Sequence, residues 1–417
     1  MRIGLVTTEY PGTGLPSAGL GSYVQRLSRA LIEAGHAPTV VVSGSASANL
    51  RDQGVQVVVA DSRLRAPLKF ANHATAKVFG RSMTILKRAL AVRQVVLELD
   101  SRARFDILHY ASSAGVGLFL PTNRPTVCRL SSYAAMWHAA GDFSHITPLY
   151  IWQEKFWERR AICRADTIFA PSQVVADYVS KELNRDVNVI RSPMALTLGD
   201  VDPDLYQRCL AGKLYLLHFG RLTLAKGIDI VAQAARPILE AHPNLQLVLC
   251  GSEVVYRSGP ASQMVIRSAG EHSDRVVYLG KLSQAQLIPI VANAHAVILP
   301  SRVDNLPNTC IEAMALGRVV IGTSGTSLDE LIEDGRSGFI IQPGSAAELL
   351  PVIEHVLSLS SAEVAEIGRQ ARRRLEPLRP EVVVPKLISF YEEAIDQHSR
   401  VGLRATRQTA NGSGPNG

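Results

Sequence analysis

Residues 294–344, AHAVILPSRVDNLPNTCIEAMALGRVVIGTSGTSLDELIEDGRSGFIIQPG, decide the fold of this chain. Within this stretch HAVILPS reads as a short apolar strand, and PNTCIEAMAL reads as a helix that starts at a proline and ends before Gly317. A second apolar strand, RVVIGT, follows at once. Strand, loop, helix and strand in this order form the crossover that joins parallel strands, so the stretch predicts a parallel α/β sheet.

The loop between the first strand and the helix is a candidate ligand site. Ligands of parallel sheets bind at the carboxyl ends of the strands, and a helix N-terminus attracts anions. We therefore expect the backbone amides of the loop from Asp304 to Asn308 to face a ligand. The carboxylates of Asp304 and Glu312 are good acceptors for sugar or ribose hydroxyls, and a helical side chain at 312 leans back toward the loop. The alternative is that Asp304 only complements the helix dipole and Glu312 is solvated.

A pair of cations follows a second strand of the same half of the chain. The sequence LYLLHFGRLTLAKG predicts a strand that runs into Gly220 and Arg221, with Lys226 at the start of the next helix. Arginine can bind a diphosphate in bidentate fashion and lysine adds a point charge, so both could hold an anionic ligand. Two ordinary surface cations are the alternative.

A glycine-rich turn follows the first strand of the chain. Residues 2–7 read as an apolar strand, YPGTGLPSAGLGS follows it, and a helix then runs to Gly35. Glycines let a ligand approach the backbone closely, which makes Gly19 and Gly21 candidates for a phosphate cradle. The spacing does not match the dinucleotide fingerprint G-x-G-x-x-G. A plain tight turn remains the alternative.

These motifs resemble a known family. The segments DNLPNT, EAMALG, SGTSLDELIEDGRSGF and FGRL with a following KG are similar to those of family 4 retaining glycosyltransferases, which have the GT-B fold. The resemblance implies that Asp304 contacts the donor sugar, Glu312 the nucleotide ribose, and Arg221 with Lys226 the donor diphosphate. Here the first acid of the motif is aspartate rather than glutamate.

The resemblance also implies a wider set of site residues. The catalytic candidates are Asp304, Arg221 and Lys226, and backbone near residues 277–280 would recognise the base. The full donor-binding set is Gly19, Gly21, Gly220, Arg221, Lys226, Leu279, Asp304, Asn305, Leu306, Asn308 and Glu312. In many relatives a histidine near the reaction centre contacts the donor sugar. Ser131 stands at that place here, and the candidates to replace the histidine are His109 and His138.

The basic character of the chain comes from one segment. The formal net charge is +7, and residues 62–104 carry ten lysines or arginines against two acids, a local charge of +8. This segment could contact an anionic membrane or an anionic acceptor, and the alternative is a solvated helix face. Nucleic acid is not expected as a partner, because no known nucleic-acid-binding motif accompanies the charge.

The composition also indicates the cellular compartment and whether a metal is bound. The five cysteines are scattered without a C-x-x-C spacing, so we expect them to be reduced and buried in a cytosolic protein. No apolar run reaches the ~20 residues that a membrane-spanning helix needs, and the N-terminus does not read as a signal peptide. No metal site is expected, since the acids at 200, 202 and 204 lack the other residues of a calcium loop.

The predicted architecture is α/β, with two doubly wound Rossmann-like domains facing a cleft and a C-terminal helix that crosses back. The predicted divisions are an acceptor-binding domain (1–194), a linker (195–212), a nucleotide-sugar domain (213–378), the crossing helix (379–400) and a disordered tail (401–417). The predicted function is retaining transfer from a UDP- or GDP-type sugar to a hydroxyl on a saccharide, lipid-linked or natural-product acceptor. No cofactor is expected, and the predicted location is the cytoplasm, with the inner face of the membrane as an option. The alternatives are a sugar-nucleotide epimerase or hydrolase of the same fold, and a noncatalytic membrane-surface adaptor.

Overall fold

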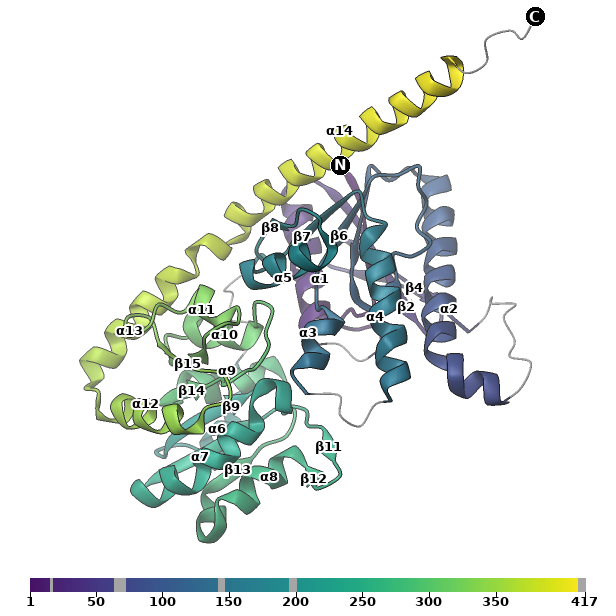
Figure 1. Cartoon of the computed structure of the whole chain (residues 1–417). Coiled ribbons are helices and arrows are strands. Elements are labelled where there is room, and N and C mark those ends of the chain that lie inside the picture. Colours follow the sequence, from purple (N-terminus) through teal and green to yellow (C-terminus); the bar gives the residue numbers. More distant parts are fainter. Residues whose placement is uncertain (16–17, 64–72, 142–146, 195–200, 412–417) are drawn as a thin grey trace, which may run out of the picture. The chain divides into compact units, whose positions relative to one another are not determined.

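The computed structural model of the chain describes residues 1–15, 18–63, 73–141, 147–194 and 201–411, and it describes the backbone alone for 73–77 and 401–411. The chain divides into two compact units (Figure 1). One unit comprises Met1–Ala135, Ile146–Met194 and Pro380–Gly417, and the other comprises Met136–His145 and Ala195–Arg379. Each unit contains its own sheet and is described by itself.

The first unit is built on an eight-stranded sheet of order β3-β4-β2-β1-β5-β6-β7-β8. All neighbouring strands are parallel except β3, which pairs antiparallel with β4 at one edge. The strand order reverses between β1 and β5. The strands are β1 (Arg2–Thr7), β2 (Ala37–Gly44), β3 (Ala48–Asp52), β4 (Val55–Asp61), β5 (Ile107–Ala111), β6 (Thr126–Arg129), β7 (Thr167–Ala170) and β8 (Asn188–Val189).

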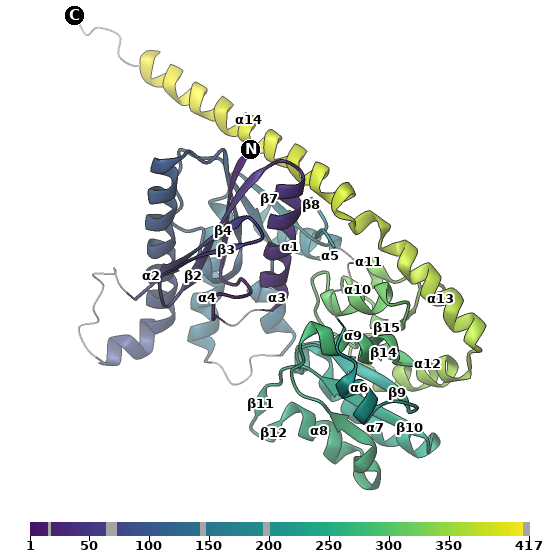
Figure 2. The ribbon, with the colours of Figure 1, turned by 180° about the vertical axis from the view of Figure 1, so that it is seen from behind.

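Helices cover the first sheet because its strands are apolar on both faces. Ile3 and Leu5 pack with one side of α1, whose Val24, Leu27 and Leu31 recur at helical spacing, and the C-terminal helix packs on the same core. On the other face α2 lies beside α4 (Figures 1 and 2). The helices are α1 (Gly19–Glu33), α2 (His73–Arg102), α4 (Pro148–Cys163), α5 (Gln173–Leu183) and α14 (Pro380–Asn411), with a 3-10 turn η1 (Ser113–Gly115). The short helix α3 (Ala134–Ala139) is divided between the units, because the segment from Met136 onward belongs to the second one.

The C-terminal helix returns to the first unit, as the sequence predicted. Val383, Leu387 and Tyr391 of α14 are buried in the core that contains β1 and α1. The helix also extends to Asn411, beyond the predicted end at residue 400, into the segment predicted to be a disordered tail. Apart from Gly402, residues 401–411 contain no helix breaker, and good helix formers such as Arg404 and Ala405 sustain the backbone. Residues 412–417 lie outside the described part of the chain.

The second unit is built on a six-stranded parallel sheet of order β13-β10-β9-β14-β15-β16. The strands are β9 (Leu214–Phe219), β10 (Leu245–Cys250), β13 (Val276–Tyr278), β14 (Ala296–Ile298), β15 (Val319–Thr323) and β16 (Phe339–Ile341). A separate two-stranded ribbon pairs β11 (Val255–Tyr256) with β12 (Gly259–Pro260). The strand, loop, helix and strand predicted for residues 294–344 are confirmed, and Gly317 ends the helix with φ 69°.

Helices of the second unit bury their apolar sides against this sheet, with α7, α8 and α12 sharing one core with β9, β10 and β14. The helices are α6 (Asp204–Cys209), α7 (Ile228–Ala241), α8 (Ala261–Ser268), α9 (Gln284–Ala292), α10 (Asn308–Ala315), α11 (Leu328–Leu331), α12 (Ala346–Ser358) and α13 (Ser361–Arg374), with 3-10 turns η2 (Leu224–Lys226), η3 (Gly270–Arg275) and η4 (Glu376–Leu378). The segment predicted as a linker therefore contains a helix, α6, and its residues 195–200 lie outside the described part.

The cysteines fit the sequence prediction only in part. All five are free thiols, and Cys128, Cys250 and Cys310 are buried as expected. Cys163, however, is exposed at the last turn of α4, because it lies on the solvent side of that helix. None of the helices in the described residues is long and apolar enough to span a bilayer.

Candidate functional site

Two loops meet where the strand order of the second sheet reverses. From β9 the chain continues to β10 and β13 on one side, whereas β14, β15 and β16 extend the sheet on the other side. Because β9 and β14 are parallel neighbours, the loops that leave their carboxyl ends stand next to each other. Open parallel sheets bind ligands at such a switch point.

An ion pair joins these two loops. Lys226 Nζ lies 2.7 Å from Asp304 Oδ2, and the Asp304 side chain is only 7% exposed. Ser301 Oγ donates to the same carboxylate oxygen at 3.2 Å, and the Asn305 amide donates to Oδ1 at 3.0 Å. Both oxygens of the carboxylate therefore have partners, and the carboxylate holds the ammonium group in one position. The structure thus brings together two residues that the sequence had assigned to one site.

Arg302, which the sequence analysis did not single out, fastens the same loops. Its guanidinium donates to both carboxylate oxygens of Asp229 at 2.6 Å and to the carbonyl of Leu224 at 2.6 Å. Its backbone amide donates to the carbonyl of Ala225 at 2.8 Å. The Asp229 carboxylate raises the pKa of Arg302. This fork-shaped contact fixes the turn that carries Lys226 against the strand end that carries Asp304.

Two glycines let the backbones of this edge approach closely. Gly227 has φ +74°, and a Cβ added there would lie 2.0 Å from the carbonyl oxygen of Pro300. A Cβ on Gly251 would lie 1.6 Å from the carbonyl oxygen of Gly220. Side chains cannot be placed at these distances, so the close packing of the loops after β9, β10 and β14 requires glycine.

The loop before α10 differs from the sequence expectation in its amides. We expected the backbone N–H groups from Asp304 to Asn308 to face a ligand. Instead, the Asn305 amide donates to Asp304, and the Leu306 amide donates to Ser327 Oγ at 2.6 Å. Leu306 adopts a left-handed conformation, φ 56°, and its side chain is buried. These two amides are therefore engaged within the chain and are not open to a ligand in this structure.

The other predicted residues of the second unit lie around this edge. Arg221 is exposed just beyond the end of β9, next to Gly220. Asn308 and Glu312 are half-buried on α10, four residues apart and so on one side of the helix. Leu279 follows β13, is half-buried, and donates its amide to the carbonyl of Leu249 at 3.0 Å.

His218 is a buried polar residue on β9 that the sequence analysis missed. Its Nδ1 lies 2.8 Å from the carbonyl of Ile298, so Nδ1 carries the proton and donates. Its Nε2 is buried without a hydrogen-bond partner. Burial, with a smaller contribution from the charge of Lys226, lowers the pKa of His218 to about 4. The side chain is therefore neutral at pH 7 and adds no charge beneath Lys226.

The glycine-rich turn of the first unit is arranged around a carboxylate. Gly19 is exposed at the first position of α1, and Gly21 is buried two residues further along the helix. Glu9 Oε2 accepts hydrogen bonds from the amides of Ala18 at 2.7 Å and Gly21 at 3.3 Å. The side chain of Glu9 thus occupies the amides that an anion at this helix N-terminus would use. Residues 16–17 of the turn lie outside the described part.

The three candidates for the sugar-contacting position lie in different surroundings. Ser131 follows β6 and is half-buried, whereas His109 lies inside β5 and is 4% exposed. His109 Nδ1 is 2.6 Å from the hydroxyl of Tyr391 on α14. Burial, with a contribution from Arg129, lowers the pKa of His109 to about 3, so it is neutral. His138 is on α3, in the segment that belongs to the second unit.

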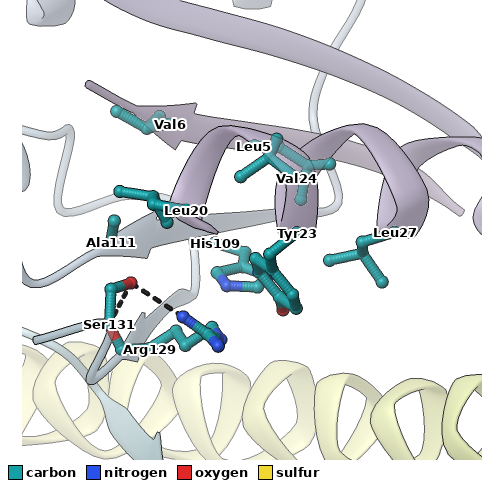
Figure 3. Close-up of a pocket in the computed structure, with 10 residues that line it drawn as sticks. All are labelled: Leu5, Val6, Leu20, Tyr23, Val24, Leu27, His109, Ala111, Arg129 and Ser131. Atoms are coloured by element: carbon teal, nitrogen blue, oxygen red, sulfur yellow. Dashed lines mark hydrogen bonds between the residues drawn. The ribbon is translucent and has the colours of Figure 1, made fainter. Parts of the chain in front are cut away.

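A small pocket lies at the carboxyl ends of β1, β5 and β6 in the first unit (Figure 3). Apolar residues of β1 and α1 line one side of it. The polar groups in its wall are Tyr23, His109, Arg129 and Ser131. Arg129 escaped the sequence analysis, as did His218 and Arg302. Arg129 and His218 nevertheless stand in otherwise apolar strand sequences, TVCR and LLHF, and a polar residue in such a run is the signal that could have marked them.

Among the described residues, no group of three or more histidines, cysteines, aspartates or glutamates is arranged to hold a metal ion. The polar groups that do converge at the switch point of the second sheet are Lys226, Arg302 and their carboxylate partners, and Arg221 follows the end of β9 beside them in the chain. Together with the close backbone approach at Gly220 and Gly227, this composition suits an anionic ligand that also carries hydroxyl groups.

Comparisons with known proteins place the chain in a family. It matches the description "Glycosyl transferase 4-like domain" over residues 18–192 and "Glycosyl transferases group 1" over residues 210–374. A glycogen synthase of Mycobacterium tuberculosis is 25% identical over 394 residues, which cover 90% of each chain. The chain spans nearly the whole length of this relative.

Solved structures of the same architecture cover nearly the whole chain. A sucrose-phosphate synthase from Thermosynechococcus elongatus superposes with a TM-score of 0.75 at 19% identity, covering 94% of this chain and 98% of that chain. Anabaena HepE in complex with UDP and glucose superposes with a TM-score of 0.69 at 19% identity, covering 94% and 100%. These likenesses confirm the predicted fold of two Rossmann-like domains. With one family profile matching each half, the chain belongs to the glycosyltransferases of the GT-B fold, of the family 4 type.

Proposed function

We propose that this protein transfers a glycosyl group from a nucleoside-diphosphate sugar, of the UDP or GDP type, to a hydroxyl acceptor with retention of configuration. The observation that carries the proposal is the Lys226–Asp304 pair at the switch point of the second sheet, held between loops that glycines and Arg302 pack together. Such a preorganised cation at a strand end suits the leaving diphosphate, whose negative charge grows in the transition state.

Each residue of this edge then has a role in the proposed reaction. Lys226 and Arg221 bind the diphosphate and stabilise its charge, each contact contributing about 1.5 to 3 kcal/mol. Asp304 orients Lys226 and accepts a hydrogen bond from a hydroxyl of the donor sugar. Glu312 accepts hydrogen bonds from the ribose hydroxyls, and the backbone at Leu279 contacts the base. The first domain holds the acceptor, which attacks on the face that the diphosphate leaves.

The comparisons give a starting point for the donor but not for the acceptor. Anabaena HepE was crystallised with UDP and glucose, which makes UDP-glucose the first donor to test. Other relatives are named for a particular acceptor or for a different transferred sugar, such as a D-inositol 3-phosphate glycosyltransferase of Arthrobacter and a kanosaminyltransferase of Streptomyces kanamyceticus. The acceptor class therefore has to be read from this chain's own first domain.

The experiment is a measurement of nucleoside-diphosphate release from a panel of UDP- and GDP-sugars, each with and without a panel of hydroxyl acceptors. Release that depends on an acceptor supports transfer, and proton NMR of the product should show the anomeric configuration of the donor. Equal release without any acceptor would favour a hydrolase, and a new donor epimer without release would favour an epimerase. No turnover of any donor would count against the enzyme and leave the adaptor alternative.

We also propose a contact with an anionic membrane through segment 62–104 and its neighbour α4. Residues 64–72 of this segment lie outside the described part. Val78 and Phe79 on α2 and Leu149 and Trp152 on α4 are all exposed, with Phe79 at 52% and Trp152 at 58%. The two helix ends adjoin, since Gln153 Nε2 donates to the carbonyl of Val78 at 2.9 Å. Clustered apolar side chains beside a segment of charge +8 suit the surface of an anionic bilayer.

Vesicle flotation tests this membrane contact. Vesicles with phosphatidylserine should bind the protein, and vesicles of phosphatidylcholine alone should bind it less. Trp152→Ser with Phe79→Ser should lower the bound fraction several-fold, whereas Val255→Ser, an exposed apolar residue of the second unit, should not. Equal binding by the double variant and the control variant would overturn the contact.

A further inference from the structure

The first unit contains a buried arginine at the carboxyl end of β6. Arg129 is 5% exposed. Its two terminal nitrogens donate to neutral hydroxyls, Nη1 to Ser131 Oγ at 3.0 Å and Nη2 to Ser192 Oγ at 2.9 Å. Its guanidinium lies 3.7 Å from the centre of the Tyr23 ring. Figure 3 shows Arg129 with its hydrogen bond to Ser131 and the Tyr23 ring facing the guanidinium.

None of these partners compensates the charge. Across the described residues, no carboxylate forms an ion pair or hydrogen bond with Arg129, and its Nε is buried without a hydrogen-bond partner. A buried cation without a counter-ion is costly, because neither hydroxyls nor an aromatic ring replaces the hydration that it loses. Burial accordingly lowers the pKa of Arg129. Two half-buried arginines of this unit do have a carboxylate partner, Arg124 with Asp100 at 2.9 Å and Arg81 with Glu154.

Arg129 lies at the edge of the first sheet where a ligand would bind. It lines the pocket at the carboxyl ends of β1, β5 and β6, beside the point where the order of the first sheet reverses between β1 and β5. That edge is where ligands of parallel sheets bind. His109 in the same wall is neutral, so the net charge of the pocket wall is positive. Ser131 is half-buried, whereas the other polar residues of the wall, Tyr23, His109 and Arg129, are buried.

We propose that Arg129 binds an anionic oxygen of one of the two sugar substrates, a carboxylate or a phosphate oxygen, with the Ser131 hydroxyl beside it. The inference rests on the proposed function, because it is the glycosyl transfer that supplies the two sugars. The pocket is small, so it takes the charged end of a substrate and not a whole sugar ring. The missing counter-ion then arrives with the substrate, which makes charge a criterion for substrate choice.

The first test uses inorganic phosphate as the probe and thermal unfolding of the full-length protein as the readout. Phosphate should raise the melting temperature of the wild type and of Lys226→Ala, which lacks the diphosphate cation of the second unit. It should raise that of Arg129→Met much less, while Arg129→Lys should keep part of the response. Without phosphate, Arg129→Met should melt at or above the wild-type temperature, because an uncompensated buried charge has been removed.

A purely structural arginine gives a different pattern. If Arg129 only ties Ser131 to Ser192, Arg129→Met melts lower and the phosphate response of the remaining folded protein is unchanged, which would overturn the inference. Should Arg129→Met fail to fold, Ser131→Ala serves as the second variant. It keeps the arginine and removes one neighbour, and its phosphate response should be weakened but present. A response equal to wild type in both Arg129→Lys and Ser131→Ala would likewise count against the site.

The second test asks which substrate carries the charge. One arm compares UDP-glucose with UDP-glucuronate as donors, and the other compares glucose with glucose 6-phosphate as acceptors. In one arm the wild type should prefer the anionic member at least tenfold in kcat/KM. Arg129→Met should lose this preference while its rate with the neutral member changes little. No preference in either arm, with turnover of neutral substrates intact, overturns the inference and leaves the proposed function standing. No turnover of any pair counts against the proposed function, whereas the phosphate response still decides whether Arg129 binds anions.

Discussion

The carboxyl edges of the two sheets handle charge in opposite ways. In the second unit each cation at the switch point except Arg221 has a carboxylate partner, Lys226 with Asp304 and Arg302 with Asp229. In the first unit the buried cation Arg129 has only hydroxyls and a ring among the described residues. The cations Lys226 and Arg302 of the second unit are therefore neutralised in the free protein, whereas Arg129 of the first unit lacks a counter-ion among the described residues.

This difference separates two ways of building a binding site. A paired edge is rigid before its ligand arrives, so little ordering remains to be done when a diphosphate binds. An unpaired buried cation destabilises the free protein and is relieved by its ligand, so it couples stability to the identity of that ligand. The paired edge therefore suits the invariant part of a nucleotide sugar, and the unpaired one suits the part that distinguishes one substrate from another.

The largest effect on stability is expected from a substitution that separates the packed loops of the second unit. Gly227→Ala would place a Cβ 2.0 Å from the carbonyl oxygen of Pro300 at a φ of +74°. We expect it to lower the free energy of unfolding by at least about 3 kcal/mol, since backbone strain and overpacking add. Gly212→Ala is the matched control, because Gly212 has the same φ with no atom within 4 Å. It should cost about 1 kcal/mol, and equal costs in urea unfolding would show that the loops are not interlocked.

Removing the lysine tests whether the pair serves a ligand. Lys226→Ala should weaken binding of UDP or GDP about 10- to 100-fold in calorimetry, because one charge-assisted contact to phosphate is lost. It should also lower stability by leaving Asp304 buried without its partner, and Lys226→Ala with Asp304→Asn should recover stability without recovering affinity. Lys213→Ala, an exposed lysine at the start of β9, is the control. Nucleotide affinity unchanged by Lys226→Ala would remove this residue from the site.

Much of this edge could be predicted from the sequence, because local patterns determine it. Apolar runs, glycines and proline punctuation located β9, β14 and α10, and the parallel crossover placed Lys226 and Asp304 at strand ends. The contact between them could not be predicted, since it depends on which strands are neighbours in the sheet. The occupied amides of Asn305 and Leu306 were likewise hidden, because Ser327 reaches Leu306 from 21 residues away.

Less of the site in the first unit could be predicted from the sequence, for a physical reason. Gly19 and Gly21 predicted a turn but not the carboxylate of Glu9 that fills it. The environment of Arg129 combines Tyr23 of α1, Ser131 after β6 and Ser192 after β8, three segments far apart in the chain. A missing counter-ion is a property of the folded neighbourhood and has no local sequence pattern.

Acid should destabilise the paired edge through His218. Burial lowers the pKa of His218 to about 4, below its ordinary value of 6.5, so the unfolded chain binds a proton more readily. Stability is therefore fully present above pH 6.5 and falls as the pH drops toward 4, by up to about 1.4 kcal/mol per pH unit for this proton. His218→Gln should flatten that part of the urea-unfolding profile. Equal profiles for wild type and His218→Gln would contradict the assignment.

The smallest effect on stability is expected from breaking the pair between Arg302 and Asp229. Arg302 and Asp229 are both about a quarter exposed, with side-chain exposures of 27% and 22%, so water screens part of their attraction. Arg302→Gln should cost about 1 kcal/mol of stability, and Arg102→Gln, in an exposed pair with Glu98, should cost nothing measurable. If Arg302 acts by holding the turn that carries Lys226, Arg302→Gln should also weaken UDP binding two- to fivefold. Arg302→Lys should restore stability better than it restores UDP affinity. The reason is that only a guanidinium can bond both the Asp229 carboxylate and the Leu224 carbonyl. Unchanged nucleotide affinity in both variants would mean that Asp304 alone positions the lysine.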